Sequence, residues 1–454
     1  PISLRTTGTV TPDDWHLKTL QLDSIQAVIS GNGLLERDGD EFIDSHLDAE
    51  IKIATLSPFS SWLARPLPDQ DLQLSVELDS RAGVLLVEQL VMLSGDSDLS
   101  VTGRATNPSF PELTLAGQSQ LINLAPWIRT FTTGKAGMAT ETAPTSTTPQ
   151  VVQLIPDYPI SFDAWKGFEA DISLDIDNLT GLVRPLEDLQ SAFSLEQDGL
   201  RVDQLSFDDG VNGSVALTGS LVDQDKTPQL DLALTGESLI YGIPKAPEED
   251  VDALPSYNVK LRLTGSGQTT RTLASSLNGY LNLAMGSGHI LNTGFDRLSN
   301  TFLQELSNAL NPFKEQQAMT AINCAAVFNT LKNGQAFGEP SIVVDTPKIK
   351  ILANTHVSFD TEKVKASFKT IPQKGLGINM SSLVNPFVEV TGTLSAPRIS
   401  LNPANTVVGG SLAVVTGGIS LLLRSVLERL STGGNICAKR LQKANEAMAE
   451  LDST

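Results

Sequence analysis

Hydrophobic and polar residues alternate most regularly in the stretch Leu200–Gly236. Apolar residues stand at every second position, with Ser, Thr, Asp and Gly between them, and this period is typical of a β-strand with one apolar face. The phase slips between Val202 and Leu205, so we predict a β-bulge at Asp203–Gln204 that keeps the later apolar side chains on that face. Turn residues divide the stretch into an antiparallel meander of about three strands.

The same pattern occurs twice upstream, where an apolar residue again precedes a glycine by a nearly fixed interval. The three pairs are Leu20 and Gly33, Leu90 and Gly103, and Leu205 and Gly219. A repeat of this kind predicts strands that stack into an elongated array.

Alternation resumes at residue 257 and continues in predicted strands to residue 401. In 293–311 the apolar residues recur instead at spacings of three and four, and Pro312 follows, which predicts an amphipathic helix. A second helix is predicted at 438–451, near the C-terminal end.

Two stretches rich in Thr, Pro or acidic residues interrupt the strand pattern and predict boundaries. The predicted segments are two β-repeats at 1–129, a linker or loop at 130–156, a β-repeat at 157–242, a linker at 243–256, a β region at 257–404 and a helical tail at 405–454.

A sheet with one apolar face must cover that face with a second layer, close on itself or fill the face with another molecule. The predicted helix at 293–311 is too short to cover three repeats. The alternation is equally typical of a β-sandwich, in which two sheets bury each other, and of a curled sheet with an apolar groove. Periodicity alone leaves both open.

The formal net charge of −20 is unevenly distributed, since residues 1–330 carry −24 and residues 331–454 carry +4. An acidic body is repelled by phosphates, which excludes nucleic acid as a partner. The acidic side chains otherwise solvate strand faces and edges. No basic or apolar leader is found at Pro1, so we expect any targeting or anchoring segment to precede it.

Residues 399–423 contain no charged side chain. The core of this stretch, 407–423, has 17 residues and would span about 26 Å as a helix, near the lower limit for crossing a bilayer. A helix that touches a membrane or caps a groove and a helix buried on the end of the array both fit, and a full span fits less well. The candidate membrane or capping residues are Leu412, Val414, Val415, Ile419, Leu421, Leu422 and Leu423.

The sequence offers few candidates for catalysis. The four histidines, His16, His46, His289 and His356, are scattered without metal-ligand spacing, and no nucleophile-elbow, phosphate-loop or dinucleotide motif occurs. We therefore expect no enzyme activity, no cofactor and no metal site.

Several short motifs in a fixed order resemble the C-terminal part of AsmA-like proteins. They are the glycine repeats, the strand at Ser276–Gly279 with the helix that follows, the strand from Cys324 to Gly334, and the ending at 390–397. Cys437 is also similar to a residue of that family's tail. The resemblance covers most of the chain and is most specific from residue 273 onward.

The resemblance implies an elongated, curled antiparallel repeat sheet, mainly β, with a few helices near the C-terminus. Its apolar concave face would bind or conduct phospholipid acyl chains between the inner and outer membranes of a Gram-negative bacterium. The protein would lie in the periplasm, held in the inner membrane by an N-terminal segment, with membrane proteins as partners at its ends. The candidate lipid-facing residues are Val215, Leu217, Leu221, Leu230, Leu232, Leu234, Leu281 and Leu283. The alternative is a structural envelope scaffold without a lipid channel.

The chain has two cysteines, Cys324 and Cys437. In the periplasm two cysteines favour one disulfide, which would close a loop of about 110 residues and stabilise the fold by roughly 4–5 kcal/mol. Two unrelated buried thiols are the alternative.

Overall fold

The computed structural model consists of two compact units. Unit 1 comprises Pro1–Thr148 and Ser161–Asp223, and unit 2 comprises Pro149–Ile160 and Gln224–Thr454. The structure describes residues 3–11, 14–38, 41–63, 66–81, 84–106, 110–130, 153–163, 166–241, 243, 253–291, 306, 310, 319–373, 387–401 and 435–453.

Unit 1 is a sheet in which each strand pairs with the next one along the chain. Its strands are β1 (Ser3–Val10), β2 (Asp14–Asp23), β3 (Ala27–Asp38), β4 (Glu41–Ile53), β5 (Leu72–Arg81), β6 (Val84–Ser94), β7 (Ser97–Thr106), β8 (Glu112–Asn123), β9 (Glu169–Thr180), β10 (Leu186–Glu196), β11 (Gly199–Asp208) and β12 (Ser214–Gln224). The short helices η1 (Ser57–Phe59) and α1 (Ser60–Leu63) follow β4. The mainly β, repeating and antiparallel sheet that the sequence predicts is confirmed, with one exception.

The exception is the pair β8 and β9, which run parallel. The chain leaves β8 at Asn123 and enters β9 at Glu169, so the connection is long enough to return to the starting end of the sheet. Parallel neighbours require such a crossover, whereas a tight turn can only join antiparallel strands. The alternation along each strand is the same in both cases, and the prediction of uniformly antiparallel pairing is wrong here.

The predicted bulge at Asp203–Gln204 is confirmed, because Val202 lies opposite Gly219 and Leu205 opposite Leu217. The two upstream copies contain the same device at Lys18–Thr19 and Glu88–Gln89. Leu17 and Leu20 face Gly33 and Gly31, and Val87 and Leu90 face Gly103 and Val101. The glycine of each repeat is therefore the cross-strand partner of the residue just before a bulge.

Unit 2 continues with consecutive antiparallel strands. They are β13 (Thr227–Leu239), β14 (Tyr257–Ser266), β15 (Asn278–Met285), β18 (Cys324–Lys332), β19 (Gln335–Asp345), β20 (Ile349–Ser358), β21 (Val364–Pro372), β22 (Phe387–Thr393) and β23 (Ala396–Leu401). A separate hairpin consists of β16 (Gly288–Leu291) and β17 (Met319–Ile322).

The helices of unit 2 whose full bounds lie in the described residues are α3 (Thr270–Ser276) and α6 (Ile436–Asp452). Helix α6 confirms the terminal helix predicted at 438–451. Helix α3 was not predicted. It begins with a capping box, in which the Thr269 side chain accepts from the backbone N–H of Thr272 and the Thr272 side chain accepts from that of Thr269.

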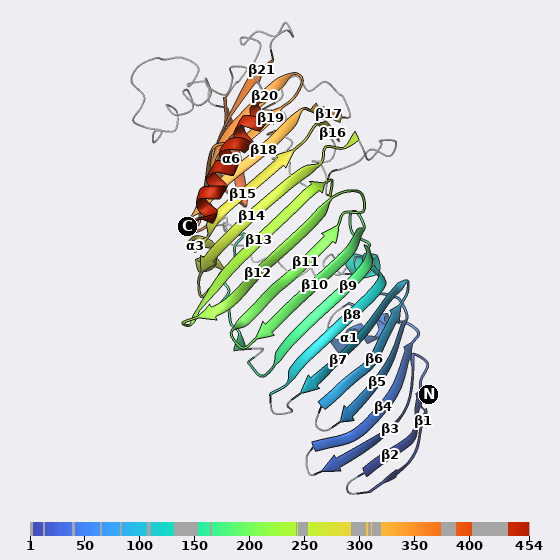
Figure 1. Cartoon of the computed structure of the whole chain (residues 1–454). Helices are drawn as coiled ribbons and strands as arrows, with labels where there is room; N and C mark the ends of the chain where they lie inside the picture. Colours follow the sequence, from blue (N-terminus) through green and yellow to red (C-terminus); the bar gives the residue numbers. More distant parts are fainter. Residues whose placement is uncertain are drawn as a thin grey trace, which may run out of the picture. The chain divides into compact units, whose positions relative to one another are not determined.

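Both faces of the sheet in unit 2 carry cores. On one face, Leu310 packs with Ala353, Phe368 and Val388, and its carbonyl accepts a hydrogen bond of 3.0 Å from the Thr370 hydroxyl. On the other face α6 lies across β15, β18 and β19 (Figure 1), where its residues join two buried clusters. The clusters consist of Cys324, Ala326, Val343, Leu352, Ile436 and Cys437, and of Tyr280, Phe328, Ala444 and Met448.

Several sequence predictions fall on residues that the structure does not describe. Of the helix predicted at 293–311, Leu306 and Leu310 are described and are helical, and the remainder lies outside the described residues. The same holds for residues 131–152 and 244–252 of the two predicted linkers. The boundary between the compact units falls after Asp223, inside the repeat predicted at 157–242.

Candidate functional site

The candidate site in unit 2 is one face of the strands β13, β14 and β15. Cross-strand pairs place leucines beside one another there, such as Leu232 opposite Leu263 and Leu261 opposite Leu281. Cross-strand partners share a face of the sheet. We call this surface the β13–β15 apolar face, and it consists of Leu230, Leu232, Leu234, Val259, Leu261, Leu263, Leu281 and Leu283.

These side chains are half-buried, and none belongs to a core cluster of unit 2. Helix α3 approaches the face at one end, since a Cβ on Gly265 would lie 3.0 Å from Ser276 Oγ and 3.1 Å from a Leu277 methyl group. Helix α6 lies on the opposite face. Apart from the β16–β17 hairpin, the described strands of unit 2 form a single layer (Figure 1). Among the described residues no second sheet, as a β-sandwich would require, covers the apolar leucines.

The opposite face of the same strands is polar. Asp231 accepts a hydrogen bond of 2.8 Å from Nη2 of Arg262, and its other carboxylate oxygen forms an ion pair with Nη1 at 2.6 Å. Both side chains are partly exposed, so this pair contributes little to stability. The predicted lipid-facing residues of β13 and β15 therefore all lie on the apolar side.

The predicted residues of unit 1 lie on an equivalent surface of β12. Val215 faces Phe207, Leu217 faces Leu205 and Leu221 faces Leu200. All six side chains are half-buried. The bulge in β11 is what keeps Leu200 and Leu205 on one face, because the extra residue compensates for their odd spacing.

The predicted membrane or capping residues Leu412, Val414, Val415, Ile419, Leu421, Leu422 and Leu423 lie outside the described residues. Within the part of the chain that the structure describes, no helix has both the length and the apolar character needed to cross a bilayer.

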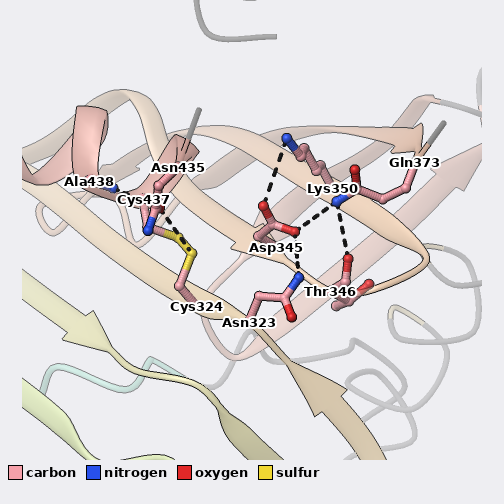
Figure 2. The surroundings of a disulfide bond; sticks show 9 residues. All are labelled: Asn323, Cys324, Asp345, Thr346, Lys350, Gln373, Asn435, Cys437 and Ala438. Atoms are coloured by element: carbon pink, nitrogen blue, oxygen red, sulfur yellow. Dashed lines mark hydrogen bonds and ion pairs between the residues drawn. A yellow bond between two sulfur atoms is a disulfide. The ribbon is translucent and has the colours of Figure 1, made fainter. Parts of the chain in front are cut away.

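The predicted disulfide is confirmed, and it joins Cys324, the first residue of β18, to Cys437 in the first turn of α6 (Figure 2). The Cα atoms are 6.3 Å apart and the bond spans 113 residues of sequence. Asn435 caps the helix, since its side-chain oxygen accepts from the backbone N–H of Ala438 at 3.1 Å. The disulfide and the cap together fix the start of α6 on the face of the sheet opposite the β13–β15 apolar face.

Beside the disulfide, the Asp345 carboxylate interacts with polar side chains from three neighbouring segments (Figure 2). It accepts from Asn323 at 3.1 Å and from Gln373 at 2.9 Å, and it lies 3.8 Å from the Lys350 ammonium. These contacts satisfy a mostly buried charge at the end of the sheet.

Arg440 of α6 is buried and enters a break in the β18–β19 ladder. Its Nε donates to the carbonyl of Pro340 at 2.6 Å, its Nη2 donates to that of Phe328 at 3.2 Å, and the guanidinium stands 4.8 Å from the centre of the Phe328 ring. Burial lowers the pKa of Arg440 to about 10, so the side chain remains positive at neutral pH. The sequence contains no motif that predicts this residue.

A second site missed by the sequence analysis holds residues 153–160 against α3 and the β20–β21 turn. The Glu362 side chain, 2% exposed, accepts from the backbone N–H groups of Leu154 and Ile155 at 2.9 and 2.8 Å, and Arg271 lies 3.8 Å away. Burial alone would raise the pKa of Glu362, but the two N–H donors and the Arg271 charge outweigh it and lower the pKa. Sequence alone offers only an acidic turn at this position.

No protein-family model matches the chain, and a comparison with curated protein sequences finds no match.

Proposed function

We propose that the β13–β15 apolar face binds the acyl chains of lipids, and that the protein handles phospholipids in a bacterial cell envelope. The observation that carries this proposal is a surface of eight aliphatic side chains that no described helix or second sheet covers along its length. Acyl chains suit this surface because they need no hydrogen bonds, and each buried methylene contributes about 0.8 kcal/mol.

The resemblance to AsmA-like proteins adds the biological setting, which is phospholipid transport between the inner and outer membranes of a Gram-negative bacterium. The disulfide agrees with an oxidising compartment such as the periplasm. No catalytic role enters the proposal.

The test is a photocrosslinking pair on one strand. A photoreactive residue at Leu232 should crosslink to phospholipid, whereas the same residue at Asp231, on the opposite face, should not. A second pair, Leu217 and Thr218, tests the surface of unit 1 by itself. Native mass spectrometry of the purified chain should show copurified phospholipid, and its absence together with equal crosslinking at Leu232 and Asp231 would refute the proposal.

A further inference from the structure

We propose that His46, Asp48 and Glu77, which share one face of β4 and β5 in unit 1, bind a divalent transition-metal ion such as Zn²⁺. The three residues come from two neighbouring strands. His46 and Asp48 are two apart on β4, so their side chains share a face, and Glu77 of β5 is the cross-strand partner of Asp48. Their ligand atoms all lie within 4.8 Å of one another.

Asp79 orients the imidazole. It is the cross-strand partner of His46, and its Oδ1 lies 2.5 Å from His46 Nδ1. An ionised carboxylate only accepts hydrogen bonds, so Nδ1 carries the proton and donates it to Asp79. Arg81 forms an ion pair with the other oxygen of Asp79, which keeps this carboxylate ionised. This carboxylate–histidine pair is the arrangement that holds many metal-binding histidines in place.

The other ring nitrogen of His46, Nε2, faces the Asp48 carboxylate. A neutral imidazole protonated at Nδ1 cannot form a hydrogen bond with this carboxylate, because both atoms are acceptors. His46 Nε2 is 3.1 Å from Asp48 Oδ2. With the proton on Nδ1, Nε2 presents a lone pair to an oxygen that also presents lone pairs. A cation must lie between the two atoms, and either a proton or a metal ion can fill this role. Glu77 adds a third acceptor, and among the described residues its carboxylate makes no hydrogen bond or ion pair.

The spacing suits a metal ion after small side-chain rotations. Zinc binds nitrogen and oxygen at about 2.0–2.2 Å, so its tetrahedral ligands lie roughly 3.4 Å from each other. One nitrogen and two carboxylate ligands leave a fourth position for water. A hollow of about 470 Å³ lies beside the cluster, lined by Asp48 and Glu77 and by other polar side chains such as Lys18, Gln21 and Glu50. The open position of the metal has room to bind a small polar ligand there.

The test is titration of the metal-free full chain with Zn²⁺ and Co²⁺, followed by calorimetry and by the visible absorption of Co²⁺. We expect one site per chain. Substitution of a ligand, His46→Ala or Glu77→Gln, should weaken binding at least tenfold. Asp79→Asn should weaken it about 10- to 100-fold while the Co²⁺ band keeps its position, because Asp79 only positions the ligand.

Two controls separate this site from general attraction of cations to an acidic surface. His356→Ala removes an exposed histidine of unit 2, and Asp171→Asn removes an exposed charge from β9, a strand of unit 1 that pairs with neither β4 nor β5. Neither should change the affinity by more than about twofold. Losses in these controls equal to those of His46→Ala and Glu77→Gln, or no saturable binding below about 100 µM, would overturn the proposal and leave a protonated His46 as the cation between the carboxylates.

Discussion

Replacement of Arg440 by methionine should weaken the packing of α6 on the sheet of unit 2, although most of the buried side-chain stem is retained. The structure shows why the guanidinium is needed. Pairing between β18 and β19 is interrupted after Val327 and resumes at Thr330, and the gap leaves the carbonyls of Phe328 and Pro340 pointing at Arg440. Methionine fills the space but donates no hydrogen bond.

The expected loss follows from those two carbonyls and from the aromatic ring. A buried acceptor without a donor costs about 1–3 kcal/mol, and the contact between the charge and the ring of Phe328 contributes about 0.5–2 kcal/mol. Part of this loss is recovered if water enters, so we expect about 2–5 kcal/mol for Arg440→Met. Lys443→Met, one turn further on and exposed, should change stability by less than about 0.5 kcal/mol.

Hydrogen–deuterium exchange read by mass spectrometry is the suitable assay, because a chain with two compact units does not guarantee a single unfolding transition. Peptides from α6 and β18 should exchange at least about thirtyfold faster in Arg440→Met, which corresponds to roughly 2 kcal/mol. The intact disulfide keeps α6 tethered, so the measurement reports local opening. Protection within threefold of the wild type would refute the reasoning, since the carbonyls would then have found other donors.

Three further outcomes are expected. Reduction of the Cys324–Cys437 disulfide should lower the stability of unit 2 by about 4–5 kcal/mol in the chain-entropy model, because the bond closes a loop across 113 residues; chemical unfolding with and without reductant checks this, and equal midpoints would contradict it. The pKa of Glu362 is lowered in the folded state, so the stability that its carboxylate gives to residues 153–160 is complete above the unfolded pKa near 4.5 and is lost as pH falls through the folded pKa. The protection of the Leu154 and Ile155 amides, measured relative to free exchange from pH 7 to pH 3, should fall accordingly, and Glu362→Gln should make this protection independent of pH. Gly103→Ala should destabilise unit 1 by about 1–3 kcal/mol, because a Cβ there would lie 2.4 Å from the Thr114 carbonyl oxygen; thermal unfolding checks this, and a neutral effect would show that β7 and β8 can separate.

Most of the strands in this fold follow from local sequence, because alternation with period two depends only on neighbouring residues. The bulge at Asp203–Gln204 could be predicted for the same reason, since a phase slip is visible within one strand. The parallel pairing of β8 and β9 could not, because both orientations use the same alternation. The pairing of Cys324 with Cys437 could be predicted because the chain has no other cysteine.

The polar sites depend on strand register and were therefore hidden. His46 and Asp79 are 33 residues apart and meet only because β4 and β5 pair with these two residues in register. Glu362 reaches Leu154 across more than two hundred residues. Arg440 is one of several basic residues in α6, and only the position of the ladder break beneath it distinguishes it from Lys443. The sequence prediction of no metal site rests on the spacing of residues along the chain. The three proposed ligands, His46, Asp48 and Glu77, come together across two paired strands.

One face of the sheet in unit 2 is apolar from β13 to β20, but different parts of this face are covered to different extents. Leu283 of β15 faces Val327, Val327 faces Ile342, and Ile342 faces Ala353, so the face runs without interruption from β15 to β20. At β20 it is covered by Leu310, whereas at β13–β15 no described helix lies on it apart from α3 at its edge. An acyl chain lying on the leucines of β13–β15 would therefore meet protein instead of open surface as it moved toward β20.

If the face does carry lipid, photocrosslinking at Leu232 and Leu281 should be strong and crosslinking at Ala353 should be absent, because Ala353 is fully buried. Equal labelling at all three positions would show that Leu310 is displaced and that the track continues across unit 2.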